Sequence, residues 1–143
     1  MSVAKKNLGE NKSLKVVIDS NIWYSAFFHQ GKPATVLVQC LQEHVVITSD
    51  YLISEVKLII TKSSAYRSWC LRICKLMAKY KFDDDSEPEP NIDIRDPKDS
   101  PIVSLAIRSE ANLLVTGDKD ILEFKFTNRT LALTPEEFIK LKL

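Results

Sequence analysis

The chain has 143 residues, of which 45% are hydrophobic and 27% are charged, and its formal net charge is +1. This length and composition are those of one globular domain with a single core. The nearly balanced charge excludes a protein whose overall field attracts nucleic acid, so any such attraction must come from local patches. No apolar run reaches the ~20 residues that a membrane-spanning helix needs.

The start of the chain is polar. It contains Lys5, Lys6 and Lys12, and it lacks the apolar segment of a signal peptide. We therefore expect a flexible N-terminal tail over residues 1–13, a single domain over residues 14–143, and a cytoplasmic protein.

The first half of the chain alternates between apolar runs and amphipathic segments. The β-branched run at residues 16–18 is typical of a strand buried on both faces, and a similar run covers residues 45–48. Helices are expected over residues 20–28, 34–43 and 50–62. Ser49 is a suitable N-cap for the third of these helices. The alternation predicts an α/β fold with a parallel sheet.

The second half of the chain continues this alternation after a long helix. We expect, in order, a helix at residues 64–81, a brief edge strand at 80–82, an acidic loop at 83–95, a helix at 99–111, a buried strand at 113–116 and a weaker strand at 130–133. Asp99, with Pro101 after it, marks the start of the helix at 99–111. Thr134, Pro135 and Glu137 form a capping-box pattern that opens a last helix.

Four acids stand near the ends of these elements. Asp19 directly follows the first strand, and Asp118 follows the 113–116 strand after one glycine. Glu55 lies about two turns into the helix after the second strand, and Asp99 begins another helix. In open parallel sheets, functional groups gather beyond the carboxyl ends of the strands. We therefore expect the four acids to converge at one edge of the sheet.

Converging carboxylates favour a metal ion. Acids a few ångströms apart repel one another and raise each other's pKa values, and a divalent cation relieves this repulsion. All-oxygen ligation favours Mg²⁺ or Mn²⁺ over zinc, and the two histidines, His29 and His44, lie outside the acid-bearing stretches. Such a cation typically acts on phosphates, where it activates a water for in-line attack.

Each acid also has a purely structural alternative. Asp19 and Asp99 could each cap the helix that follows. Asp118 and Asp120 could form a turn. Glu55 could be a solvated surface residue of its helix. The joint pattern favours the functional interpretation, because two acids end two apolar strands and helix acids lie between them.

Several stretches resemble the sequence motifs of PIN domains. They are, in order, residues 16–21, 49–56, 96–101 and 114–120, with residues 134–138 as a common closing segment. Their order and spacing cover roughly residues 14–143. In style they are similar to the toxins of prokaryotic type II toxin–antitoxin pairs, the VapC-like ribonucleases.

The resemblance implies a three-layer α/β/α fold with a mostly parallel sheet of four to five strands, and hydrolysis of RNA with Mg²⁺ or Mn²⁺. It implies that Asp19, Asp99 and Asp118 bind the metal. It also implies that Glu55 is the fourth catalytic acid and orients a water or a second metal. The implied supporting residues are Asn21, Thr116 and Asp120. The implied partners are an RNA substrate, a second copy of the chain and a small antitoxin whose tail enters the active groove.

A basic stretch lies between the second and third motifs. Residues 56–82 include no acid, and Arg72, Lys75 and Lys79 recur on one face of the expected helix. A basic helix face beside a metal groove predicts contact with the RNA backbone. The alternative is a solvated face whose charge the acidic loop balances.

Other functions compete with the ribonuclease. A catalytically inactive PIN-like module that binds RNA or protein is disfavoured, because a pure binder has no need of carboxylates beside a polyanion. A phosphate-accepting receiver domain would need a pair of acids after the first strand, where Ser20 and Asn21 follow Asp19. A phosphatase with an aspartyl nucleophile would need a second acid at position 21.

Overall fold

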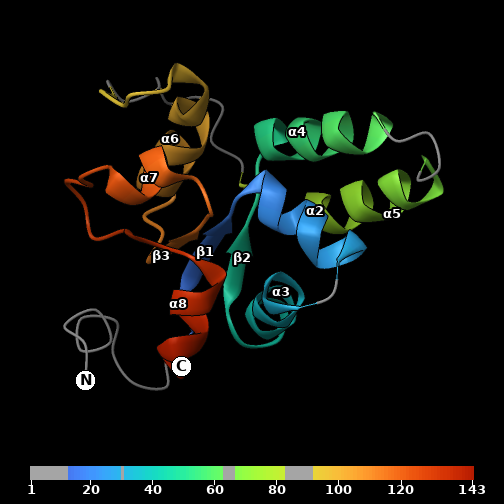
Figure 1. The fold of residues 1–143 in the computed structure, drawn as a ribbon, viewed down its shortest axis with the longest axis horizontal. Coiled ribbons are helices and arrows are strands. Elements are labelled where there is room, and N and C mark those ends of the chain that lie inside the picture. Colours follow the sequence, from blue (N-terminus) through green and yellow to red (C-terminus); the bar gives the residue numbers. More distant parts are fainter. Residues whose placement is uncertain (1–12, 30, 63–66, 83–91) are drawn as a thin grey trace.

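The computed structural model describes residues 13–29, 31–62, 67–82 and 92–143 (Figure 1). The predicted N-terminal tail and most of the acidic loop lie outside these residues. Four parallel strands form one sheet in the order β2-β1-β3-β4. They are β1 (Lys15–Ile18), β2 (Val45–Ile47), β3 (Leu113–Val115) and β4 (Leu131–Leu133). The predicted α/β fold with a mostly parallel sheet is confirmed.

Helices flank this sheet. They are α2 (Ser20–Phe28), α3 (Lys32–Glu43), α4 (Asp50–Thr61), α5 (Arg67–Ala78), α6 (Ser100–Arg108), α7 (Lys119–Glu123) and α8 (Pro135–Lys140), with a 3₁₀ turn, η2 (Pro97–Asp99), before α6. Helices α2 to α5 gather on the β2 side of the sheet, and α6 and α7 lie on the β3 side (Figure 1). Within the described ranges, no helix combines the length and the apolar character that crossing a bilayer requires.

The central strands are buried on both faces. Residues 16–18 and 113–115 have no exposed surface. Val17 pairs with Ile47 on one side and with Leu114 on the other. Because successive side chains of a strand point to opposite faces, helices must cover both faces of the sheet. The sheet is therefore the middle layer of the predicted α/β/α arrangement.

The predicted caps of two helices are confirmed. The Ser49 hydroxyl accepts a hydrogen bond from the Leu52 amide at 3.1 Å. Thr134 and Glu137 form the reciprocal capping box, with both hydrogen bonds at 3.1 Å. The Ser49 cap matters for the site, since it fixes the first turn of α4 just beyond the carboxyl end of β2.

Helix α6 is shorter than predicted. It ends at Arg108 instead of Ala111, because Glu110 adopts a left-handed backbone conformation with φ 54°. The Ala111 amide then donates to the Ala106 carbonyl at 2.9 Å and closes the last turn. A non-glycine residue in this conformation gave no sequence signal for the helix end.

The region after α5 also differs from expectation. Helix α5 ends at Ala78, and the expected edge strand is reduced to one parallel bridge between Thr48 and Lys81. The Thr48 amide donates to the Tyr80 carbonyl, and the Phe82 amide donates to the Thr48 carbonyl, both at 2.9 Å. The bridge lies directly after β2, at the edge of the sheet.

Candidate metal centre

The carboxyl ends of β1 and β3 bring Asp19 beside Thr116. Ile18 and Val115 are paired in the parallel register, and the Asp19 amide donates to the Val115 carbonyl at 2.9 Å. Thr116 Oγ1 donates to Asp19 Oδ2 at 2.8 Å and accepts from the Asp118 amide at 3.0 Å. One hydroxyl thus joins the residues that follow two neighbouring strands.

Asp19 is a buried carboxylate with 9% of its surface exposed. Burial raises its pKa, hydrogen bonds from Thr116 and Ser20 oppose this rise, and the negative charge of Asp118 adds to it. Asp19 occupies the N-cap position of α2, but its side chain makes no capping hydrogen bond. The capping alternative therefore does not explain this acid.

Asp99 lies where η2 passes into α6. Its side chain does not cap α6, and its Oδ2 is buried without a hydrogen-bond partner among the described residues. Burial is the main cause that raises the pKa of Asp99 to about 6. The further causes are the negative charges of its neighbours, Asp118, Asp96, Asp19 and Asp120. Asp99 is thus the carboxylate on which the local negative charge converges.

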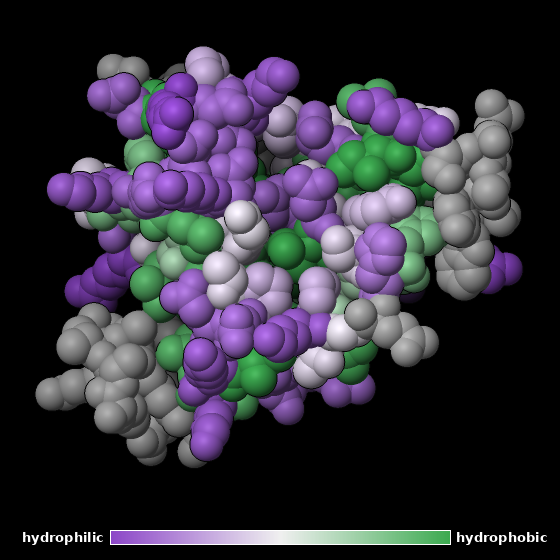
Figure 2. Space-filling model, in the orientation of Figure 1, coloured by the Kyte–Doolittle hydropathy of each residue, from purple (hydrophilic) through white to green (hydrophobic). Residues whose placement is uncertain are grey.

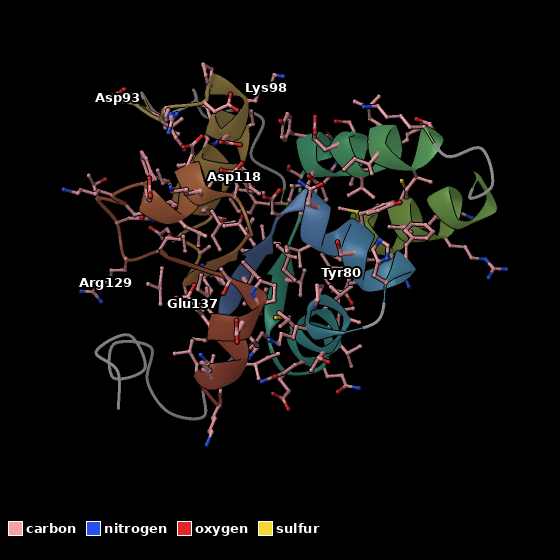
Figure 3. The ribbon with its side chains drawn as sticks, in the orientation of Figure 1. Tyr80, Asp93, Lys98, Asp118, Arg129 and Glu137 are labelled. Carbon is pink, nitrogen blue, oxygen red and sulfur yellow. The ribbon has the colours of Figure 1, made fainter. Side chains whose placement is uncertain are left out.

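Three carboxylates come within the spacing of ligands to one ion. Oxygens of Asp96, Asp99 and Asp120 all lie within 4.8 Å of one another. Asp118, at the start of α7 (Figure 3), accepts from the Asp120 amide at 2.8 Å, so it caps α7 through Oδ1. Arg95 lies 3.7 Å from Asp120 but is 84% exposed, so solvent screens this pair.

Helix α4 supplies the opposite side of the site. Tyr51 and Glu55 lie one turn apart on this helix, and both are half-buried. The Tyr51 hydroxyl donates to the Lys98 carbonyl at 3.0 Å. Burial raises the pKa of Tyr51, and the negative charges of Glu55, Asp19 and Asp99 raise it further. The phenol therefore lies among acids from three elements.

The four predicted acids interact electrostatically around Asp99 and Tyr51, but of the three predicted metal ligands only Asp99 belongs to the group with ligand spacing, so the predicted ligand set stays a prediction. The structure adds Asp96 and Tyr51, which sequence reasoning did not select. The signal for Asp96 was its position one turn before Asp99, in the same motif. Tyr51 had only its helical spacing from Glu55, which does not distinguish it from any other residue on α4.

The predicted supporting residues differ in their surroundings. Thr116 is buried and donates to Asp19. Asp120 belongs to the group of three carboxylates. Asn21, in contrast, has an exposed side chain in the first turn of α2. Its supporting role stays a prediction.

The three basic residues predicted to contact RNA have exposed side chains. Arg72 and Lys75 lie on α5, and Lys79 directly follows it. Helix α5 packs along α4, which carries Glu55, and the two helices project together from the β2 side of the sheet (Figure 1). Exposure is compatible both with RNA contact and with a solvated face, so this role also stays a prediction.

The donor set fits a hard divalent cation. Two carboxylate oxygens that each lie about 2.1 Å from one Mg²⁺ are roughly 3–4 Å apart, and the spacing within the acid group allows this. A cation would also satisfy the buried Oδ2 of Asp99. Among the described residues the group contains only carboxylates, as Mg²⁺ and Mn²⁺ prefer.

The protein is thus an α/β protein with an acidic site at the carboxyl edge of its parallel sheet. The sequence profile of the PIN domain family matches residues 15–120. The chain belongs to the PIN domain family, as its motifs predicted.

One curated protein and one solved structure are similar to this chain. It is 30% identical over 145 aligned positions to the uncharacterized protein MJ1680 of Methanocaldococcus jannaschii, with 92% of this chain and 93% of that protein covered. Its fold is similar to a chain in the crystal structure of VapBC2 from Rickettsia felis bound to a DNA fragment from their promoter. That match has a TM-score of 0.60 and 14% identity, and covers 85% of this chain and 98% of that chain. At this identity the likeness shows the shared fold.

Proposed function

We propose that this protein is a Mg²⁺- or Mn²⁺-dependent ribonuclease that hydrolyses phosphodiester bonds. The observation that supports the proposal is the group of Asp96, Asp99 and Asp120, whose negative charge adds to that of Asp19 and Asp118 around Asp99, with one buried oxygen of Asp99 left without a partner among the described residues. Concentrated negative charge opposes the approach of a polyanionic substrate. A bound divalent cation removes this repulsion, because it binds both the carboxylates and a phosphate of the substrate.

Each acid has a role in this proposal. When bound, the cation supplies the Lewis acidity that activates water and stabilises charge on the phosphate. Asp19, Asp99 and Asp118 hold it, and the Thr116 hydroxyl orients Asp19 by donating to its Oδ2. Glu55 faces this site from α4 and orients the attacking water.

Asp120 and Asp96 add negative charge beside Asp99 and strengthen cation binding. Asn21 is the second residue of α2, two positions after Asp19, and its exposed side chain supports the site from there. Arg72 and Lys75 on α5, and Lys79 directly after it, contact the RNA backbone. These assignments are part of the same proposal.

We further propose that the protein is the toxin of a toxin–antitoxin pair, acts in the cytoplasm as a homodimer, and is inhibited by a cognate antitoxin. The shared fold with a chain of the VapBC2 assembly supports this assignment. Exposed apolar side chains offer surface for such partners: Leu58 on α4 is 54% exposed and Val38 on α3 is 51% exposed. Figure 2 shows hydrophobic surface over the α4 side and largely hydrophilic surface over α6 and α7.

The first experiment is cleavage of a mixed RNA pool with Mn²⁺, with Mg²⁺ and with EDTA. The wild-type protein is compared with a variant that carries Asp19→Asn and Asp118→Asn. The matched control carries Glu43→Gln and Glu110→Gln, two exposed acids that precede β2 and β3 at the opposite edge of the sheet. The control removes the same charge without touching the site.

We expect metal-dependent cleavage by the wild type and the control, and none by the Asp19 and Asp118 variant. Cleavage that survives both site substitutions contradicts the assigned site. A folded wild-type protein that binds RNA but cleaves none with either metal supports the alternative, a catalytically inactive PIN-fold module that binds RNA or protein.

A further inference from the structure

Tyr51 connects the helix that carries Glu55 to the turn that carries Asp99. Its hydroxyl donates to the carbonyl of Lys98, which directly precedes Asp99 in η2, at 3.0 Å. Lys98 lies at the α6 end of the molecule in Figure 3. This hydrogen bond therefore spans the two sides of the acidic site.

The η2 turn has little support of its own. It is a 3₁₀ turn of three residues, none of them buried. The Asp99 amide donates to the Asp96 carbonyl at 3.0 Å, and the Lys98 amide donates to Asp96 Oδ1 at 3.0 Å. Because such turns have poor hydrogen-bond geometry, a bond from outside the turn contributes much of its order.

The surroundings of Tyr51 keep its hydroxyl a donor. Burial, the charges of Glu55, Asp19 and Asp99, and a hydrogen bond to Glu55 disfavour the phenolate, so its pKa is raised above the ordinary value. The hydroxyl has one hydrogen to donate, and the carboxylate of Glu55 is also within its reach, so the hydroxyl can hold both the Lys98 carbonyl and Glu55 near the site. Tyr51 thus suits a fixed structural contact and not proton abstraction.

We propose that Tyr51 is a positioning residue of the metal centre, whose hydroxyl holds η2 so that Asp99 and Glu55 face the same space. The link to metal binding rests on the proposed function, whereas the link to η2 does not. The phenylalanine variant tests both links, since it removes one oxygen and keeps the aromatic ring.

The experiment compares Tyr51→Phe with wild type and with Tyr24→Phe. Tyr24 is half-buried on α2, where its ring packs at a tilt against Phe28 with centroids 4.8 Å apart, so its variant removes a hydroxyl outside the site. Hydrogen exchange of the Asp99 amide is measured without metal. Mn²⁺ affinity is measured by titration calorimetry, which does not depend on RNA cleavage.

In Tyr51→Phe we expect exchange at Asp99 to accelerate roughly fivefold, the factor for one ordinary hydrogen bond. We expect the Mn²⁺ dissociation constant to rise roughly tenfold, as for other residues that orient metal ligands. Excess Mn²⁺ then restores kcat on RNA with KM unchanged. Tyr24→Phe should match the wild type in all three measurements.

Unchanged exchange at Asp99 overturns the proposal, and so does faster exchange with unchanged Mn²⁺ affinity. An equal effect of Tyr24→Phe also overturns it, because the effect would then be global. Faster exchange at Asp99 in a protein whose wild type binds no Mn²⁺ has a different meaning: Tyr51 holds η2, and the proposed metal-dependent function fails.

Discussion

Thr116 Oγ1 donates to Asp19 Oδ2 across 2.8 Å, and both side chains are buried beyond neighbouring strands. The same oxygen accepts the Asp118 amide at 3.0 Å. The Thr116 hydroxyl therefore holds the side chain of Asp19 and the backbone of Asp118, two of the predicted metal ligands. A buried carboxylate that loses such a donor pays the full cost of desolvation.

The first prediction concerns this hydroxyl. Thr116→Val keeps the shape of the side chain but leaves a buried oxygen of Asp19 and the Asp118 amide without this partner. We expect a loss of about 1–3 kcal/mol in the free energy of unfolding, measured by urea denaturation. We also expect weaker Mn²⁺ binding. Thr116→Ser, which retains the hydroxyl, should recover most of both, and equal losses in the two variants would contradict this role.

The second prediction concerns pH and Asp99. Its pKa is raised from 3.8 to about 6 in the folded, metal-free protein. The folded state thus binds a proton that the unfolded state releases, so this contribution to stability is complete below 3.8 and is lost as the pH rises through about 6. We expect Asp99→Asn to raise the metal-free melting temperature at pH 7.5.

This gain should shrink as the pH falls from 7.5 towards 4, where wild-type Asp99 is itself neutral. Thermal melts in EDTA across that range measure the difference. A gain that stays constant with pH would show that the substitution acts through packing and not through the charge of Asp99.

The third prediction concerns metal binding and stability. Mn²⁺ at 100 times its dissociation constant should stabilise the folded protein by about 2.7 kcal/mol. The effect should be larger at pH 7.5 than at pH 5, because protons compete with the metal for Asp99. Asp19→Asn should reduce it, while the variant with Glu43→Gln and Glu110→Gln should not. Differential scanning calorimetry with and without EDTA measures both.

The fourth prediction concerns the end of α6. Glu110 holds a left-handed conformation, φ 54°, that glycine adopts at no steric cost. We expect Glu110→Gly to raise the free energy of unfolding by up to about 1 kcal/mol, and Glu110→Ala to lower it relative to glycine. Urea denaturation measures the order of the three proteins. Mn²⁺ affinity should not change, because Glu110 precedes β3, at the far edge of the sheet.

The fifth prediction concerns the basic face of α5. Changing Arg72, Lys75 and Lys79 together to Ala should weaken RNA binding. It should also reduce, by about 2, the slope of the logarithm of the binding constant against the logarithm of the salt concentration. The matched control removes the same charge from other elements: Lys125, Arg129 and Lys140. Filter binding between low and moderate salt measures the slopes. If the α5 variant keeps the wild-type slope, this face does not contact RNA.

Local chemistry determined much of this structure from the sequence. Continuous β-branched runs predicted strands buried on both faces, because no alternation is needed when helices cover both sides. The caps at Ser49 and Thr134 could also be predicted from the sequence, since a cap involves only residues three positions apart. The end of α6 was not predictable, because it depends on the backbone conformation of Glu110 alone. The end of α5 was not predictable either, because the chain after it pairs with Thr48, a residue distant in sequence.

The sequence also showed that Asp19 and Asp118 follow apolar strands. Because the strands are parallel, both acids were expected at the carboxyl edge of the sheet. Only the tertiary structure decided what surrounds them. The order β2-β1-β3-β4 puts the ends of β1 and β3 side by side, and no local pattern encodes that order. It is this packing that leaves Asp99 without a capping bond, brings Asp120 to Asp96, and places Tyr51 on Lys98. Contacts between distant segments depend on how the layers pack, and a single sequence shows the segments but not their neighbours.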